Sequence, residues 1–148
     1  MTSTDPTIIA LEQQVACYER LAKLAAVQHE YVQQNQTERL LDVLRGRQEV
    51  LDQIARFERE IAPRKRVWGA YLAGLGASER DRAEALLGET RRLLEEITAA
   101  DRDDALVLQQ RKLNLGRQIN QAAAARQVNK NYAAAAYGAR QARMDVQR

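Results

Sequence analysis

Apolar residues recur every three or four positions along most of the chain, which is the spacing of one face of an α-helix. Two such stripes predict a helix over about 7–34 and a second helix over about 38–62, joined by the polar stretch QNQTE. Helices of similar length with a short connection predict an antiparallel hairpin. The apolar positions are Ile8, Leu11, Val15, Tyr18, Ala22, Ala25 and Val32 in the first stripe, and Leu40, Val43, Leu44, Val50, Leu51, Ile54, Phe57 and Ile61 in the second.

Residues that favour helix starts stand before both stripes. Asp5 can accept hydrogen bonds from the free N–H groups of a first turn, and Pro6 fits that turn because no N–H is needed there. Asn35 or Thr37 is the expected cap of the second helix. Pro63 is expected to stop or bend that helix, because proline lacks the backbone donor.

The second half of the chain predicts a linker over 63–77 with at most one short helix, a long third helix over about 78–132, and a basic, alanine-rich tail over 133–148. Asp101 and Asp104 interrupt the apolar stripe of the third helix. A continuous helix is nevertheless expected, because no glycine or proline intervenes. Four linker residues are expected to pack against one end of the helices, namely Trp68, Tyr71, Leu72 and Leu75.

The length of the third helix matters for the fold. At 1.5 Å per residue it would span about 80 Å, about twice the hairpin. Its second half must therefore fold back as a fourth helix or project with its apolar side unpaired. The predicted fold is a single all-α domain of extended shape. It consists of an antiparallel hairpin with a long third helix, arranged as a three- or four-helix bundle or a coiled-coil-like structure.

The composition supports this prediction. The chain has 148 residues, with one Phe, one Trp, two Pro and seven Gly, and it is rich in the residues that long helices use. Runs of alternating β-branched residues, which would indicate a sheet, are missing.

The small net charge of +3 conceals a strong asymmetry. Residues 1–108 carry 15 Lys and Arg against 19 Asp and Glu, whereas residues 109–148 carry eight basic residues against one acid, Asp145. The basic character therefore belongs to the end of the chain.

The chain offers little for catalysis. Cys17 is the only cysteine, so it forms no internal disulfide, and it is expected to be a small buried side chain. His29 is the only histidine and lies on the first apolar stripe, where we expect it to be packed or half-buried rather than catalytic. We expect no metal, no cofactor and no enzymatic activity. A signal peptide and a membrane-spanning run are also missing from the pattern, so a soluble cytoplasmic protein is expected.

Three binding roles are compatible with these features. A nucleic-acid-binding protein could use the basic tail, although its cations are spaced singly and no known module is visible. A structural coiled coil could self-associate, for example as a homodimer, through the same apolar stripe. The favoured interpretation is recognition of a partner's helix, because the long helix has more apolar surface than its hairpin covers.

Several stretches resemble FlgN-like flagellar export chaperones. The resemblance covers about residues 8–138. It includes a Tyr-Glu-x-Leu step from Tyr18 to Leu21 and a Leu-Leu-x-x-Leu helix formed by Leu40, Leu41 and Leu44. The stretch LLEEITAADRDDALVLQQRKLNLGRQIN is similar to the family's long third helix, and NYAAAAYG is similar to its ending. The glycine-rich linker and the alanine-rich tail depart from the pattern.

The resemblance implies a cytoplasmic chaperone of the flagellar type III export system that works without a nucleotide or a covalent step. Members of that family bind the C-terminal helical segments of hook-associated proteins, which form the hook–filament junction. They prevent early assembly of these clients and deliver them to the export gate. The residues that would contact a client helix are Leu108, Leu115 and Ile119 as anchors, with Val128 and Tyr132 extending the contact. Tyr132 and Tyr137 would also be candidates for docking at the gate.

Overall fold

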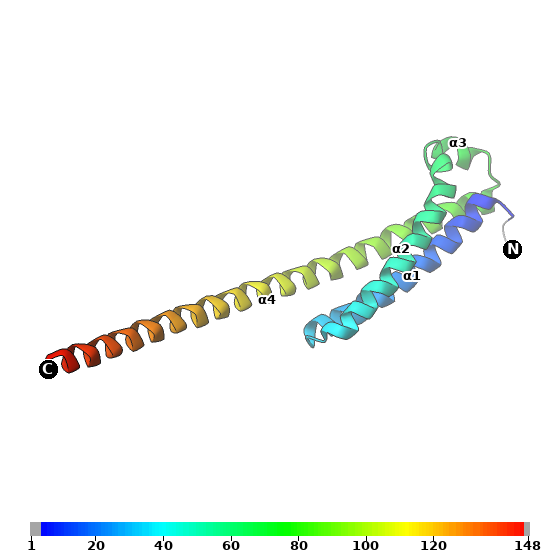
Figure 1. Ribbon diagram of the computed structural model, residues 1–148. Helices are drawn as coiled ribbons and strands as arrows, with labels where there is room; N and C mark the ends of the chain where they lie inside the picture. The colour runs from blue at the N-terminus through cyan, green and yellow to red at the C-terminus, as the bar shows by residue number, and fades with distance from the viewer. Residues whose placement is uncertain (1–3, 147–148) are drawn as a thin grey trace. The chain divides into compact units, whose positions relative to one another are not determined.

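A computed structural model describes residues 4–146 of the chain, and the side chains of residues 4–138. The regular structure within this range is helical, and it contains no strand. The helices are α1 (Pro6–Gln33), α2 (Thr37–Lys65), α3 (Trp68–Ala73) and α4 (Ala77–Val146) (Figure 1). The predicted all-α class and the long final helix are confirmed.

The chain divides into two compact units, unit 1 (Met1–Val107) and unit 2 (Leu108–Arg148). Helix α4 contributes its first part to unit 1 and its second part to unit 2. It is continuous through Asp101 and Asp104, as expected for a stretch without glycine or proline. It also runs on to Val146, so the boundary predicted near residue 132 is wrong as a helix end. Alanine is the best helix former, and nothing in the described part of the tail ends the helix.

Helix α1 begins as its sequence predicts. The Asp5 carboxylate accepts hydrogen bonds from the backbone N–H groups of Thr7, at 2.9 Å, and of Ile8, at 3.2 Å, while Pro6 occupies the first turn. These bonds satisfy donors that have no partner inside the helix.

The turn between α1 and α2 differs from the prediction. Asn35 has a φ of 56° and ends α1 instead of capping α2. The backbone N–H of Asn35 donates to the carbonyl of Val32, and that of Gln36 donates to the carbonyl of Tyr31. These two bonds form the left-handed closure that commonly ends helices, a conformation that Asn tolerates better than most residues. The residue at the cap position of α2 is Gln36, which makes no side-chain capping bond.

The predicted linker does contain one short helix, α3, as expected. Trp68, Leu72 and Leu75 pack against the core of unit 1, and Tyr71 is buried. The Tyr71 hydroxyl donates a hydrogen bond of 2.8 Å to the Asp5 carboxylate, which ties α3 to the start of α1. Pro63 lies in the last turn of α2, which continues to Lys65, so proline does not stop the helix there.

Unit 1 has a shared core from α1, α2 and the first part of α4. One cluster joins Ile8, Leu11 and Val15 of α1 to Ile61 of α2, and includes three residues of α4. A second cluster joins Cys17, Leu21 and Ala25 to residues of α2 and to α4. The residues that α4 buries recur at steps of three, four and seven, namely Ala83, Leu86, Thr90, Leu93, Ile97 and Asp104.

Polar contacts fix how α1 and α2 face each other. Gln14 donates hydrogen bonds to Glu58, at 3.0 Å, and to the carbonyl of Ile54, at 3.4 Å. Arg20 bonds Gln53 at 2.7 Å. Later residues of α1 thus meet earlier residues of α2, which is the antiparallel order. Burial acts to raise the pKa of Glu58, but hydrogen bonds from Gln14 and Lys65 outweigh it and lower that pKa below its usual value.

Candidate interaction surface

The six predicted contact residues all belong to unit 2, and each is exposed. Their exposed fractions run from 43% for Leu108 to 73% for Tyr132. None of them belongs to the core clusters of unit 1. Unit 1 also has exposed apolar side chains, but they accompany buried cores, whereas those of unit 2 accompany neither core cluster and therefore need a functional explanation. The other four residues are Leu115, Ile119, Val128 and Tyr137.

Helical geometry divides these six residues between two faces of α4. Since each residue turns an α-helix by about 100°, Leu108, Leu115, Ile119 and Tyr137 lie within about 40° of one another. Val128 and Tyr132 lie about 120–160° around the helix from that line. One straight partner helix can contact only one of the two groups. The predicted extension of the contact through Val128 and Tyr132 therefore needs a second partner surface.

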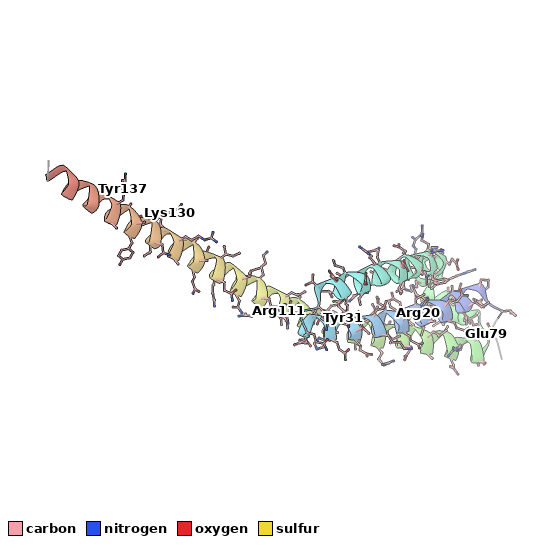
Figure 2. The ribbon with its side chains drawn as sticks, turned by 60° about the horizontal axis from the view of Figure 1, so that its bottom comes forward. Arg20, Tyr31, Glu79, Arg111, Lys130 and Tyr137 are labelled. Carbon is pink, nitrogen blue, oxygen red and sulfur yellow. The ribbon has the colours of Figure 1, made fainter. Side chains whose placement is uncertain are left out.

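The face that holds the larger group also holds basic residues. Residues spaced three or four positions apart form a line along this face, and we call this line the basic stripe. Lys112, Arg126 and Lys130 occupy contact positions on the stripe, between its apolar members. All three are exposed (Figure 2, where Lys130 and Tyr137 are labelled). The full stripe is Leu108, Lys112, Leu115, Ile119, Ala122, Arg126, Lys130, Ala133 and Tyr137.

The opposite face of unit 2 is nearly uncharged. It carries Leu113, Ala124, Val128 and Ala135, and Arg117 is the charged residue that lies among them. A shallow hollow of about 260 Å³ on this face is lined by Val128, Asn131, Tyr132 and Ala135. Such a hollow, formed by neighbouring turns of a single helix, provides no convergent polar groups for a small molecule. It adds surface for a packed side chain, not a ligand site.

Unit 1 contains a polar cluster that the sequence did not reveal. Asp104 of α4 is 2% exposed. Its carboxylate accepts a hydrogen bond of 3.2 Å from the Gln28 amide, and its Oδ1 lies 2.7 Å from Nδ1 of His29. His29 is partly exposed, as predicted. Its partner, Asp104, lies 75 residues away in the chain, so residues near His29 in the sequence do not indicate it.

Arg47 of α2 completes this cluster. Its guanidinium binds both carboxylate oxygens of Asp101, at 2.7 and 2.8 Å, and donates to the Gln28 side chain at 2.6 Å. The hydrogen bond to Asp101 raises the pKa of Arg47 against the opposing effect of burial. The two aspartates that interrupt the apolar stripe of α4 therefore face polar partners on α1 and α2.

The arrangement of this cluster fits a structural role. A carboxylate beside a histidine also occurs in catalytic sites, where it orients the imidazole toward a nucleophile. The contacts of Asp104 and Asp101 instead join three helices of unit 1. A buried polar layer of this kind defines how helices align, because a shifted register would leave its charges unpaired.

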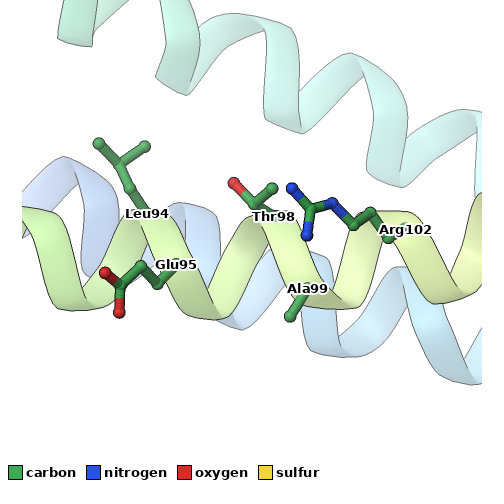
Figure 3. A pocket seen from close by; sticks show the side chains of 5 residues that line it. All are labelled: Leu94, Glu95, Thr98, Ala99 and Arg102. Atoms are coloured by element: carbon green, nitrogen blue, oxygen red, sulfur yellow. The ribbon is translucent and has the colours of Figure 1, made fainter.

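The first part of α4 has one more shallow hollow, of about 290 Å³, lined by Leu94, Glu95, Thr98, Ala99 and Arg102. Figure 3 shows Leu94 and Thr98 on the side of α4 where α2 runs, with Glu95 and Ala99 turned away from it. These side chains point to opposite sides of α4 and do not converge on one point.

Within the described part of the chain, no group of three or more His, Cys, Asp or Glu residues could hold a metal ion. None of the helices in that part combines the length and the apolarity needed to cross a bilayer. Cys17 is buried and free, as predicted. The Arg20 guanidinium lies 3.1 Å from its sulfur.

A comparison of the chain with protein-family models, with curated proteins and with solved structures found no match. The residues themselves therefore carry the functional argument.

Proposed function

We propose that this chain is a non-enzymatic helix-binding protein that acts as a cytoplasmic chaperone of the FlgN-like kind in flagellar type III export. In this proposal, unit 1 is a compact helical bundle and unit 2 is an extended binding segment. The client would be a C-terminal helical segment of a hook-associated protein. The chaperone would keep that segment from assembling early and would present it to the export gate.

The observation that carries the proposal is the exposure of Leu108, Leu115 and Ile119 on one line of unit 2. These three side chains are between 43% and 59% exposed, so burying the surface that remains accessible contributes about half of the roughly 1.5–3 kcal/mol of complete burial, or about 1 kcal/mol each. Three such residues at helical spacing suit the recognition of an amphipathic helix. Tyr137 lies further along the same line and is a candidate for docking at the gate, and Tyr132 is a second candidate on the other face.

The direct test is binding of the C-terminal segment of a hook-associated protein, measured by calorimetry. The double variant Leu115→Asp with Ile119→Asp is expected to weaken binding about tenfold or more, because it places carboxylates where a client buries apolar atoms. The matched control is Leu113→Asp with Ala124→Asp, which introduces the same charge on the opposite face at residues outside the predicted contact and is expected to retain binding. Thermal unfolding of unit 1 should be unchanged in both.

Equal loss of binding in the two double variants would contradict the assignment of the client to this face. An absence of any client binding by the unmodified chain would reject the chaperone proposal as a whole. Sedimentation over a range of protein concentrations tests the structural alternative, in which the same apolar line joins two copies of the chain and leaves no surface for a client.

Nucleic-acid binding is the second candidate, and the charge of unit 2 favours it. Residues 108–138 carry five basic and no acidic side chains. If these cations neutralise phosphates, affinity for an oligonucleotide should fall steeply with salt, and charge reversal should matter more than Leu115→Asp with Ile119→Asp. The opposite ranking would favour the helix-binding proposal.

A further inference from the structure

The order of residues along the basic stripe restricts the chemistry of its partner. The first part, from Leu108 to Ile119, is mainly aliphatic. The next two contact positions with large side chains are Arg126 and Lys130, which lie one helical turn apart. The side chains of both residues are exposed. The stripe thus has an apolar half followed by a basic half. Measured along the helix axis, Arg126 lies about 10 Å and Lys130 about 16 Å beyond Ile119.

Docking of a helix along this stripe would remove water from the two cations. Arg126 and Lys130 occupy positions on the contact line itself, not beside it. Desolvation of an unpaired charge costs free energy. An apolar partner residue at these positions offers no hydrogen bond or opposite charge to offset that cost. Carboxylates at the facing positions would offset that cost with charge-assisted hydrogen bonds. Lys112 lies at the same angle as Lys130 but stands alone in the apolar half, so it forms no cluster of cations there.

A second copy of the chain is a poor occupant of the stripe. Among residues 108–138 there is no acidic side chain, so parallel pairing of this segment with itself sets cations against cations, and antiparallel pairing sets Arg126 and Lys130 against aliphatic side chains or alanines. Nucleic acid fits the basic half, but it leaves Leu108, Leu115 and Ile119 without an apolar surface to cover. A helix with an apolar part and an acidic part satisfies both halves at once.

On the premise of the helix-binding role above, we propose that the partner of the basic stripe is a segmented amphipathic helix. Its contact positions are apolar at one end, opposite Leu115 and Ile119. Two to three turns away they carry Asp or Glu, opposite Arg126 and Lys130. The charge pair sets the register and orientation of the partner, and the apolar end supplies most of the buried area.

Three synthetic helical peptides of about 30 residues test this, since that length spans the stripe from Leu108 to Tyr137. The first has leucines at the contact positions of one half and two glutamates at those of the other half. The second has the same composition, with its glutamates moved among the leucines. The third has lysines in place of the glutamates. Calorimetry with the full chain is expected to give about tenfold or tighter affinity for the first peptide than for either of the others.

Charge reversal in the chain provides the complementary test. The double variant Arg126→Glu with Lys130→Glu is expected to lose the preference for the first peptide and to favour the lysine peptide. The matched control is Arg56→Glu with Arg59→Glu, at exposed positions of α2, which makes the same change in net charge and should leave the preference intact. High salt should narrow the difference between the peptides, because charge selects among them.

The outcomes separate this inference from the proposed function. Equal affinity for all three peptides overturns the placement of acidic partner residues opposite Arg126 and Lys130, but it leaves helix binding intact. Tighter binding of the second peptide than of the first overturns the order of apolar and acidic parts. Failure of all three peptides to bind overturns the inference about the partner's chemistry, whereas the proposed function is rejected separately, by failure of the hook-associated segment to bind. A single-stranded DNA oligonucleotide that binds more tightly than the first peptide and displaces it overturns the inference in favour of a nucleic-acid partner.

Discussion

Asp104 shows how much a single buried residue contributes to the organisation of unit 1. Its carboxylate is nearly inaccessible to water and receives hydrogen bonds from Gln28 and His29, both on α1. Burial of a carboxylate costs free energy, and hydrogen bonds from its partners are needed to offset that cost. Among the described residues, no buried side-chain nitrogen or oxygen is without a hydrogen-bond partner, so the network around Asp104 is complete.

Replacement of Asp104 by alanine is expected to lower the free energy of unfolding by about 1–3 kcal/mol, because it removes the acceptor of the Gln28 and His29 hydrogen bonds. Chemical denaturation followed by circular dichroism measures this change. Asp103→Ala is the matched control, since Asp103 is exposed and the expected effect is within about 0.5 kcal/mol. A double-mutant cycle with His29→Ala should give a coupling of about 0.5–3 kcal/mol, and additivity would contradict the pairing.

Tyr71 provides a pH-dependent readout of the contact between α3 and the start of α1. Burial, followed by the hydrogen bond to Asp5, raises the pKa of Tyr71 to about 12. The folded chain therefore holds this proton more tightly than the unfolded chain does. The corresponding stability is complete below pH ~10 and is lost as the pH rises through the raised pKa.

A spectroscopic titration of tyrosinate is expected to show a late step near pH 12 whose amplitude Tyr71→Phe lowers by one tyrosine. Burial also raises the pKa of Tyr18, so that residue still titrates late in the variant. Tyr137→Phe, in unit 2, is the control and should keep that step. Loss of the Tyr71 hydroxyl should also lower the free energy of unfolding at neutral pH by about 1 kcal/mol, because a hydrogen bond disappears. A late amplitude that is unchanged in Tyr71→Phe would contradict the assignment.

At the scale of the helices, periodicity accounts for most of what could be predicted. The apolar spacing located α1 and α2, because a stripe that must be buried leaves a regular trace in the sequence. The cap at Asp5 was also predictable, since its partners are two and three residues away. Helix ends were harder. The sequence predicts Asn35 or Thr37 as the cap of α2, but Asn35 closes α1 and Thr37 is the first helical residue of α2, since the same residue types serve turns and caps.

The six contact residues remain a prediction. All six candidates are exposed, but the sequence order concealed their division between two faces, which follows from the continuous helix of unit 2. The polar cluster of unit 1 could not be read from spacing. Asp101 and Asp104 did mark an interruption in the stripe, but their partners are 54 to 76 residues away in the chain. Contacts of that range depend on helix packing, which local patterns do not specify.

At the scale of the whole chain, burial and exposure are distributed unevenly between the units. The two core clusters consist entirely of residues between Ile8 and Ile97, all in unit 1. Unit 2 is a single helical segment rich in alanine, and such a segment gains little from burial of its own side chains. The free energy of folding should therefore come mainly from unit 1. The conformation of unit 2 should then depend on the partner that it binds.

A chain shortened to residues 1–107 is consequently expected to keep a cooperative unfolding transition, because it retains both clusters and the Asp104 network. Thermal and chemical denaturation followed by circular dichroism measure this. The matched control ends at residue 95, which removes Ile97, Asp101 and Asp104, and it should be destabilised by several kcal/mol through lost apolar and polar contacts. A non-cooperative transition in the 1–107 chain would show that unit 2 is needed for the core, which would contradict its assignment as a binding segment.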